Sequence, residues 1–174
     1  SFIFIFDNKK IKSRGVSMRI NYKGANGQLG LELSKQLSRN KEYEVICTDI
    51  EELNIVDINS VNKVISKYKP DVVINCAAHT AVDLCETDIE NAYKINAIGP
   101  RNLAIACEKV NAKFVQVSTD YVFDGNIDRP YREDDNTCPN SIYGSSQING
   151  KIHKRICSRH FIVRTAWLYG EGIT

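Results

Sequence analysis

The sequence lacks a strong excess of either charge. Its 174 residues carry 23 Lys and Arg against 21 Asp and Glu, which gives a net charge of +2. An excess of two charges, spread along the chain, cannot build the basic surface that nucleic acids or anionic membranes attract. We therefore expect neither a nucleic acid nor a membrane as a partner.

Long apolar runs and paired cysteine motifs are absent too. No stretch approaches the roughly 20 apolar residues of a membrane-spanning helix, and the short apolar run 2–6 lacks the basic start of a signal peptide. None of the cysteines forms the Cys-x-x-Cys pair with which zinc and redox sites begin. The six are Cys47, Cys76, Cys85, Cys107, Cys138 and Cys157. We interpret them as buried thiols in a reducing compartment and predict a cytoplasmic protein.

Strand-like apolar runs alternate with helical patterns from Met18 onwards. The predicted strands span 18–23, 43–48, 71–77, 113–118 and 161–166, and the predicted helices span 29–38, 61–67, 89–110 and 143–157. The helix 89–110 is expected to break near Gly99 and Pro100, and the segment 124–141 is expected to be an exposed loop. This alternation predicts an α/β fold with a doubly wound parallel sheet and helices on both of its faces.

Residues 1–17 fit none of this pattern. They precede a plausible start methionine, so we interpret them as an extraneous N-terminal extension, with an added edge strand from Phe2 to Phe6 as the alternative. Residues 18–174 are expected to form a single domain.

Three glycines lie where the first predicted strand meets the first predicted helix. In a dinucleotide-binding turn, Gly24 would permit the tight turn, Gly27 the approach of a pyrophosphate, and Gly30 close packing of helix on sheet. Asp49 follows the second strand, 19 residues beyond Gly30, where a carboxylate can bind ribose hydroxyls and repel a 2′-phosphate. The spacing therefore predicts a Rossmann-like site that leans toward NADH. The alternatives are an ordinary tight turn and a solvated aspartate at the end of a strand.

A second group of polar residues follows the fourth strand. Thr119 lies at its end, and Tyr143 opens a predicted helix 24 residues later. At the carboxyl edge of a parallel sheet, the two hydroxyls can converge on one carbonyl oxygen, with the tyrosine as proton donor. A tyrosine has a reference pKa of about 10 and is usually poised by a nearby cation, but the position one helical turn on is Gln147. The alternative is a half-buried tyrosine at the start of a helix.

These residues resemble the extended short-chain dehydrogenase/reductases, and among them the dTDP-4-dehydrorhamnose reductases. The resemblance covers nearly all of the chain from Met18 to Gly172. Its segments are 18–20, 24–30, 70–83, 96–99, 117–125, 130–134, 143–144 and 164–170. The segments 117–125 (Val-Ser-Thr-Asp-Tyr-Val-Phe-Asp-Gly) and 164–170 (Arg-Thr-Ala-Trp-Leu-Tyr-Gly) are specific to this group of reductases, whereas the glycines are shared widely.

The resemblance implies reduction of the 4-keto group of dTDP-4-dehydro-L-rhamnose by NADH or NADPH, the last step of dTDP-rhamnose synthesis. It implies a catalytic set of Tyr143, Thr119 and Gln147, the last at the family's lysine position, with Tyr121 and Trp167 lining the sugar site. The cofactor would contact Gly24, Asn26, Gly27, Gln28, Leu29, Gly30, Asp49, Ala77 and Ala78. It further implies a smaller substrate-binding domain, which we expect to be missing from a chain truncated at residue 174.

Several residues depart from the family pattern. Gln147 replaces the lysine that acidifies the tyrosine, so we expect activity to fall by about 10²- to 10⁴-fold or more. Lys23 stands where a threonine is usual, His79 where a tyrosine is usual, and Asn21 and Lys23 make the first strand unusually polar. Glu32 matches a carboxylate that some members place at a magnesium-linked dimer contact, but no magnesium site can be assigned, and a homodimer stays open.

Two further interpretations compete with an active reductase. One is a non-catalytic, dinucleotide-binding regulatory subunit resembling the β subunit of methionine adenosyltransferase, which Gln147 favours. The other is a non-functional gene fragment. Thr119 and Tyr143, both present, favour the enzyme.

Overall fold

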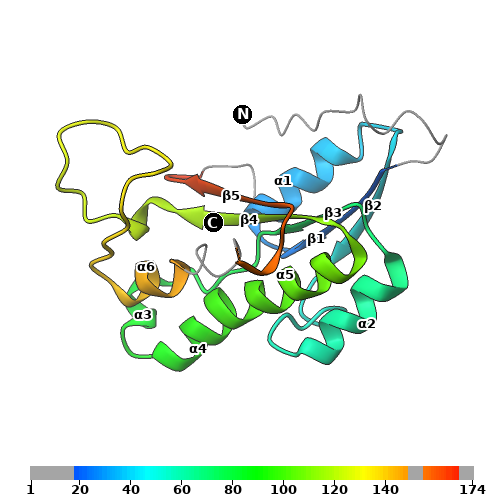
Figure 1. Ribbon diagram of the computed structural model, residues 1–174, viewed down its shortest axis with the longest axis horizontal. Coiled ribbons are helices and arrows are strands. Elements are labelled where there is room, and N and C mark those ends of the chain that lie inside the picture. Colours follow the sequence, from blue (N-terminus) through cyan, green and yellow to red (C-terminus); the bar gives the residue numbers. More distant parts are fainter. Residues whose placement is uncertain (1–17, 149–154, 169–174) are drawn as a thin grey trace.

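The computed structural model describes residues 18–148 and 155–168, and it places them in a sheet covered by helices (Figure 1). The strands are β1 (Met18–Lys23), β2 (Tyr43–Thr48), β3 (Val72–Asn75), β4 (Lys113–Thr119) and β5 (His160–Thr165). The helices are α1 (Gln28–Leu37), α2 (Ile58–Tyr68), α3 (Val82–Cys85), α4 (Ile89–Tyr93), α5 (Gly99–Val110) and α6 (Ile142–Gln147).

All strand pairs in the five-stranded sheet are parallel, in the order β2-β1-β3-β4-β5. Chain order therefore reverses between β1 and β3, because β2 lies on one side of β1 while β3, β4 and β5 follow on the other. In open parallel sheets, ligands bind outside the carboxyl ends of the strands at such a point. The predicted doubly wound parallel sheet is confirmed.

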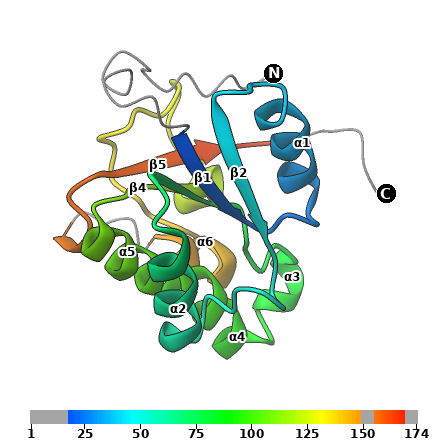
Figure 2. The ribbon, with the colours of Figure 1, turned by 90° about the vertical axis from the view of Figure 1, so that its right-hand side faces the viewer.

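Each face of the sheet has its own apolar core. Helix α1 packs Leu33 and Leu37 against the face that carries Ile20 and Ile74. Helices α2 and α5 pack against the opposite face, and Figure 2 shows them on the other side of the strands from α1. Because both faces are covered, β1 and β3 are buried along nearly their whole length.

The ends of α2 follow from local chemistry. The Asp57 carboxylate accepts a hydrogen bond from the Asn59 N–H and so caps the first turn. Lys69 closes the helix in the left-handed region, with φ 43°. Pro70 follows and cannot continue a helix.

The prediction that the helix 89–110 breaks near Gly99 and Pro100 is wrong, because the chain stays helical there. The chain runs from α4 through a π-helical segment, Lys94–Ile98, directly into α5. Pro100 lies in the first turn of α5, where its missing N–H needs no partner. The irregularity therefore precedes Gly99 and Pro100, and the helical path is continuous.

Other boundaries differ in detail from the sequence predictions. The short helix α3 and a 3₁₀ turn, Asp120–Val122, were not expected. The segment 124–141 contains no helix or strand, in agreement with the prediction, and forms the long loop drawn in yellow in Figure 1. Residues 149–154 of the predicted last helix and the predicted N-terminal extension, 1–17, lie outside the described residues.

The prediction that all six cysteines are buried is wrong for two of them. Cys47 is exposed because it lies on β2, the edge strand, and Cys138 is exposed because it belongs to the loop before α6. Cys76 is half-buried, whereas Cys85, Cys107 and Cys157 are buried, and all six thiols are free. In the part of the chain that the structure describes, none of the helices has the length and hydropathy to cross a membrane.

Candidate active site

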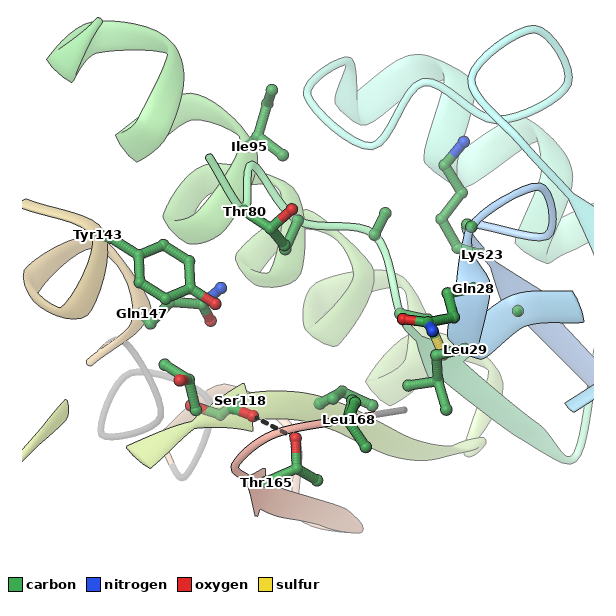
Figure 3. Close-up of a pocket in the computed structure, with 18 of the residues that line it drawn as sticks. Lys23, Gln28, Leu29, Thr80, Ile95, Ser118, Tyr143, Gln147, Thr165 and Leu168 are labelled. Carbon is green, nitrogen blue, oxygen red and sulfur yellow. Dashed lines mark hydrogen bonds between the residues drawn. The ribbon is translucent and has the colours of Figure 1, made fainter. Parts of the chain in front are cut away.

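A cavity of about 930 Å³ opens at the carboxyl ends of the strands, where the order of the sheet reverses. Figure 3 shows Lys23, Gln28 and Leu29 at one end of it and Tyr143 and Gln147 at the other. Every residue that the sequence assigned to a site lines this one cavity: Gly24, Asn26, Gly27, Gln28, Leu29, Gly30, Asp49, Ala77, Ala78, Thr119, Tyr121, Tyr143, Gln147 and Trp167. The fold therefore brings the two predicted sites together, while the roles of these residues stay predictions.

The glycine turn has the shape that a pyrophosphate needs. Gly24 has φ +84°, and a Cβ there would lie 3.0 Å from the Ala77 backbone nitrogen. A Cβ on Gly30 would lie 2.0 Å from the Gly24 oxygen, so α1 could not approach the turn with a side chain at that position. A Cβ on Gly27 would meet only the Gly24 oxygen, at 3.4 Å. Packing within the protein thus requires Gly24 and Gly30, whereas the bare Gly27 faces the cavity.

The start of α1 completes this cradle. Gly27 is the N-cap and contributes no side-chain oxygen to the first turn, which also holds no acidic residue. Backbone N–H groups and the positive end of the dipole at a helix N-terminus favour an anion. These features fit the pyrophosphate of a nicotinamide dinucleotide.

Asp49 is fixed toward the glycine turn. Its Oδ2 accepts the Asn26 N–H at 2.9 Å, and its Oδ1 accepts the Ile50 N–H at 2.7 Å. Burial alone would raise the pKa of Asp49, but these two N–H groups and the nearby Lys23 ammonium hold the pKa below its usual value. Asp49 is therefore a carboxylate at neutral pH, at the place where the sequence expects ribose hydroxyls.

The loop between β2 and α2 forms the wall beside Asp49. Its residues Ile50, Asn54, Ile55 and Val56 line the cavity. Asn102 on α5, which is buried, donates from its side-chain amide to the carbonyl oxygens of Ile55 at 2.9 Å and Val56 at 3.0 Å. Sequence reasoning missed Asn102, because nothing near it in the chain indicates a partner 47 residues away.

The opposite end of the cavity is set by a close approach of α6 to the 3₁₀ turn. A Cβ on Gly144 would lie 2.2 Å from the Tyr121 oxygen, so only glycine fits there. Ser141 caps α6 by accepting the Gly144 N–H at 3.0 Å. The rings of Tyr121 and Tyr143 meet edge to face, with centroids 5.5 Å apart. The close contact brings Tyr143 beside the end of β4.

Thr119 ends β4 and starts the 3₁₀ turn. Its hydroxyl accepts the Tyr121 N–H at 3.2 Å and donates to Asp120 Oδ1 at 3.0 Å. Burial raises the pKa of Tyr143, and hydrogen bonding with the Thr119 side chain opposes this only in part. Tyr143 is therefore a protonated phenol at neutral pH, in contact with the hydroxyl that the sequence predicted to act with it.

An amide network holds α6 against the strand-end loop that follows β3. The side chain of Asn96, in the π-helical segment, accepts the His79 N–H at 2.8 Å and donates to the His79 oxygen at 3.1 Å. It also donates to the Ser146 hydroxyl at 2.9 Å. Asn96 thus joins α6, which carries Tyr143, to the loop that carries Ala77 and Ala78. In the sequence, Asn96 belongs to the family-like segment 96–99, but that segment did not predict this role.

Gln147 lines the cavity one helical turn after Tyr143 and is buried. Among the described residues that line the cavity, Lys23 alone is basic, and Figure 3 places it at the far end from Tyr143. No described part of the lining therefore supplies the cation that the missing lysine would provide.

His79, which stands where a tyrosine is usual, lies outside the described lining of the cavity. Its Nδ1 is 3.4 Å from Cys85 Sγ, and its Nε2 is 3.6 Å from Asp88 Oδ2. Tyr121 and Trp167 do line the cavity and keep 48% and 82% of their surface exposed. Their exposed rings are available to a ligand larger than a dinucleotide alone.

Comparison with known proteins agrees with this geometry. Residues 18–173 match the model of the family described as RmlD substrate binding domain. The spore coat polysaccharide biosynthesis protein SpsK of Bacillus subtilis is 45% identical over 86% of this chain and 53% of its own length. A dTDP-4-dehydrorhamnose reductase of Aggregatibacter actinomycetemcomitans is 40% identical over 88% of this chain and 52% of its own. The chain spans about half the length of the curated relatives it matches.

Solved structures give the same result. A dTDP-4-dehydrorhamnose reductase from Clostridium acetobutylicum superposes with a TM-score of 0.86 and is 54% identical, over 90% of this chain and 56% of that one. The enzyme of the same name from Bacillus anthracis, in complex with NADP, superposes with a TM-score of 0.88 and is 42% identical, over 91% and 57%. The predicted Rossmann-like fold and the resemblance are confirmed, and the chain belongs to the RmlD substrate binding domain family.

Proposed function

We propose that this chain is the dinucleotide-binding part of a dTDP-4-dehydrorhamnose reductase, which reduces the 4-keto group of dTDP-4-dehydro-L-rhamnose. The observation that carries the proposal is the shared cavity, in which the glycine turn and the Thr119–Tyr143 pair face one another. Relatives at 40% and 54% identity carry the name of this reductase.

In this proposal each residue performs a task that its position supports. The bound dinucleotide supplies hydride. The turn at Gly27 and the start of α1 hold its pyrophosphate, and Asp49 accepts ribose hydroxyls. Tyr143 donates its phenolic proton to the ketone oxygen. The Thr119 hydroxyl, which donates to Asp120 in the structure, turns to donate its one hydrogen bond to the same ketone oxygen.

Gln147 is expected to weaken this chemistry. It can hydrogen-bond a ribose hydroxyl, but it carries no charge that would lower the pKa of Tyr143. Because the pKa of Tyr143 is raised by burial, the phenol gives up its proton less readily than one beside a lysine. We therefore expect a slow reductase.

The sugar would lie beside the exposed rings of Tyr121 and Trp167. The relatives are about twice as long as the part that this chain matches. We propose that a region corresponding to the rest of the relatives' length supplies the remaining contacts to the nucleotide sugar. A cytoplasmic location is supported by the six free cysteines.

The cofactor is a nicotinamide dinucleotide, NADH or NADPH. The charge of Asp49 by itself favours NADH, because a carboxylate repels a 2′-phosphate. The Lys23 Nζ lies 3.5 Å from Asp49 Oδ1 and offsets part of this charge. The alternative of a non-catalytic regulatory subunit rests on Gln147 alone and is not favoured by the relatives, which are named as reductases.

Two measurements test the proposal. The chain should bind NADH or NADPH, and the fluorescence of the reduced nicotinamide measures this binding. A protein of the relatives' full length that contains this chain should oxidise that cofactor when the keto-sugar nucleotide is added. Tyr143→Phe should keep the dinucleotide affinity and lose activity by at least about 10²-fold, because it removes the proton donor. Undiminished turnover by Tyr143→Phe, or turnover at the full rate of lysine-bearing relatives with Gln147 in place, would contradict the account.

A further inference from the structure

Two aromatic rings and an arginine form a contact cluster that the proposed chemistry does not use. The rings of Phe123 and Tyr131 are stacked, with centroids 4.0 Å apart and planes 11° from parallel. The guanidinium carbon of Arg164 lies over the Phe123 ring, 5.2 Å from its centroid. None of the three belongs to the described lining of the cavity. We call Phe123, Tyr131 and Arg164 the Phe123 cluster.

The Phe123 cluster joins the long loop 124–141 to β5, and Figure 1 shows this loop in yellow beside the red strand. Phe123 directly follows the 3₁₀ turn, Tyr131 belongs to the loop, and Arg164 lies on β5. The Arg164 guanidinium also donates to the Glu133 backbone oxygen at 3.4 Å. Arg164 therefore contacts the loop through both a ring and a carbonyl group.

The hydroxyl of Tyr131 fixes the ring from its other end. It donates to Asp124 Oδ1 at 2.9 Å and accepts the Gly125 N–H at 2.9 Å. The Asn126 N–H also donates to Asp124, and the two donors hold the pKa of that carboxyl below its usual value. Asp124 is therefore a charged acceptor at neutral pH, and Tyr131 is held both at its face and at its hydroxyl.

Two members of the Phe123 cluster are close neighbours, along the chain, of the exposed rings that line the cavity. Tyr121 precedes Phe123 by two residues, and Trp167 follows Arg164 by three. The contact between Phe123 and Arg164 therefore ties together the two backbone segments that carry Tyr121 and Trp167.

The backbone at Trp167 needs such a tie. Trp167 has φ 51°, in the left-handed region that bulky side chains rarely adopt. A residue persists in that region only where the surrounding structure holds it there. The ladder between β4 and β5 ends at the pair Thr119 and Thr165, two residues before Trp167. The contact of Arg164 with Phe123 adds a side-chain tie close to the point where the ladder stops.

The position of an exposed ring decides how much it contributes to binding. A gap of about 0.5–1 Å between two atoms already forfeits a quarter to a half of their contact energy. A small outward movement of Tyr121 or Trp167 would therefore weaken a sugar bound between them. The dinucleotide would be affected much less, because its proposed contacts are at the glycine turn and Asp49.

We propose that the Phe123 cluster positions the sugar site: it holds Tyr121 and Trp167 at the separation that a nucleotide sugar requires, and it thereby determines the affinity for that substrate. This inference rests on the proposed function, because it assumes that these two rings face the sugar. The members of the cluster are positioning residues, which touch neither ligand and take no part in the hydride and proton transfers.

The first test uses the chain itself, in which Trp167 is the only tryptophan. Its time-resolved fluorescence anisotropy reports the nanosecond motion of this one side chain. Tyr131→Leu removes the stacked ring, and Arg164→Gln removes the guanidinium. Tyr131→Phe keeps the ring and is the conservative variant. Arg132→Gln, which removes an exposed arginine from the same loop, is the matched control.

We expect the share of fast motion of Trp167 to grow in Tyr131→Leu and in Arg164→Gln. It should stay close to that of the unaltered chain in Tyr131→Phe and in Arg132→Gln. The dissociation constant for NADPH should stay the same in all four variants. Arg164 is only half-buried, so its variant is expected to fold even where Tyr131→Leu does not.

The second test separates positioning from a general loss of structure, in a protein of the relatives' full length that contains this chain. Tyr131→Leu and Arg164→Gln should raise the KM for the keto-sugar nucleotide by about tenfold, the effect of losing one stacked contact. The value of kcat should stay the same, because substrate and transition state lose the same contact. Tyr131→Phe should restore most of the affinity.

The outcomes distinguish this inference from the proposed function. Unchanged motion of Trp167 in a folded Arg164→Gln chain would overturn the inference, and so would a lower kcat at unchanged KM. Equal weakening of NADPH and of the sugar nucleotide would overturn it too, because the cluster would then support the whole domain. In each of these cases, an unaltered protein that reduces the keto-sugar would still support the function. Failure of the unaltered protein to reduce it would overturn the function and the sugar role together.

Discussion

The two ends of the cavity differ in how their charges are arranged. At the glycine turn, Asp49 is held by two backbone N–H groups and by the ammonium of Lys23. At the other end, Tyr143 and Thr119 present neutral hydroxyls, and Gln147 brings no charge. The chain thus places the basic side chain of the described lining at the end where we propose that a nucleotide binds, and not at the end where we propose that a proton is transferred. We therefore expect that binding and chemistry can be altered independently in this protein.

The largest effect is expected from moving a cation to the tyrosine end. In a protein of the relatives' full length that contains this chain, Gln147→Lys should raise the rate of keto reduction by about 10²- to 10⁴-fold. A positive charge near Tyr143 favours the phenolate and lowers its pKa. Gln147→Met, which adds no charge, is the control and should give no gain.

The pH profile provides a second readout of the same variant. Because burial raises the pKa of Tyr143, the phenol stays protonated at neutral pH, and activity should be lost only as pH rises through that raised pKa. Gln147→Lys should move this alkaline limb to lower pH. An unchanged limb together with an unchanged rate would mean that residue 147 does not act on Tyr143.

A smaller effect on stability and dinucleotide binding is expected from substitution of Gly27 and Gly30, two glycines of the turn that look equivalent in sequence. Gly30→Ala should lower the free energy of unfolding by about 1–3 kcal/mol or more and abolish dinucleotide binding, because its Cβ would lie 2.0 Å from a backbone oxygen. Gly27→Ala should cost less than about 1 kcal/mol of stability, the scale of an N-cap change. It should still weaken binding, because its methyl group projects where the pyrophosphate approaches. Urea unfolding and calorimetry measure the two quantities, and equal losses of stability would contradict this distinction.

The smallest effect concerns the polar face of β1. Asn21 is completely buried, and neither its side-chain nitrogen nor its oxygen has a hydrogen-bond partner among the described residues. Asn21→Val should therefore raise the free energy of unfolding by about 1–2 kcal/mol, since an unsatisfied amide is removed and a β-branched residue suits a strand. Asn75→Val is the matched control and should destabilise, because Asn75 bonds to Gln116. Destabilisation by both variants would show that Asn21 has a role that these contacts do not reveal.

The sequence predicted the strands and the site residues where the signal is local. The glycine turn is predicted from spacing and residue type, and the structure has the strand, turn and helix in those places. Tyr143 and Thr119 lie 24 residues apart, but a parallel sheet brings its carboxyl ends to one edge, so their meeting could also be expected.

What the sequence did not predict depends on contacts between distant segments. Asn96 and Asn102 hold the walls of the cavity through partners 17 to 50 residues away, and an asparagine in a helix does not indicate such partners. Lys23 was noticed only as an odd residue in a buried strand, because its partner is known only once β1 and β2 are paired. Cys47 was wrongly expected to be buried, since edge position depends on strand order.

The central claim is that one cavity holds a nicotinamide dinucleotide with its pyrophosphate at the glycine turn and its nicotinamide beside Tyr143. A crystal structure of the chain grown with NADPH tests this most directly. We expect the pyrophosphate over Gly27, the adenosine ribose beside Asp49 and the nicotinamide ring facing Thr119 and Tyr143. A pyrophosphate bound away from the start of α1, or a nicotinamide ring outside the Thr119–Tyr143 end of the cavity, would contradict the account.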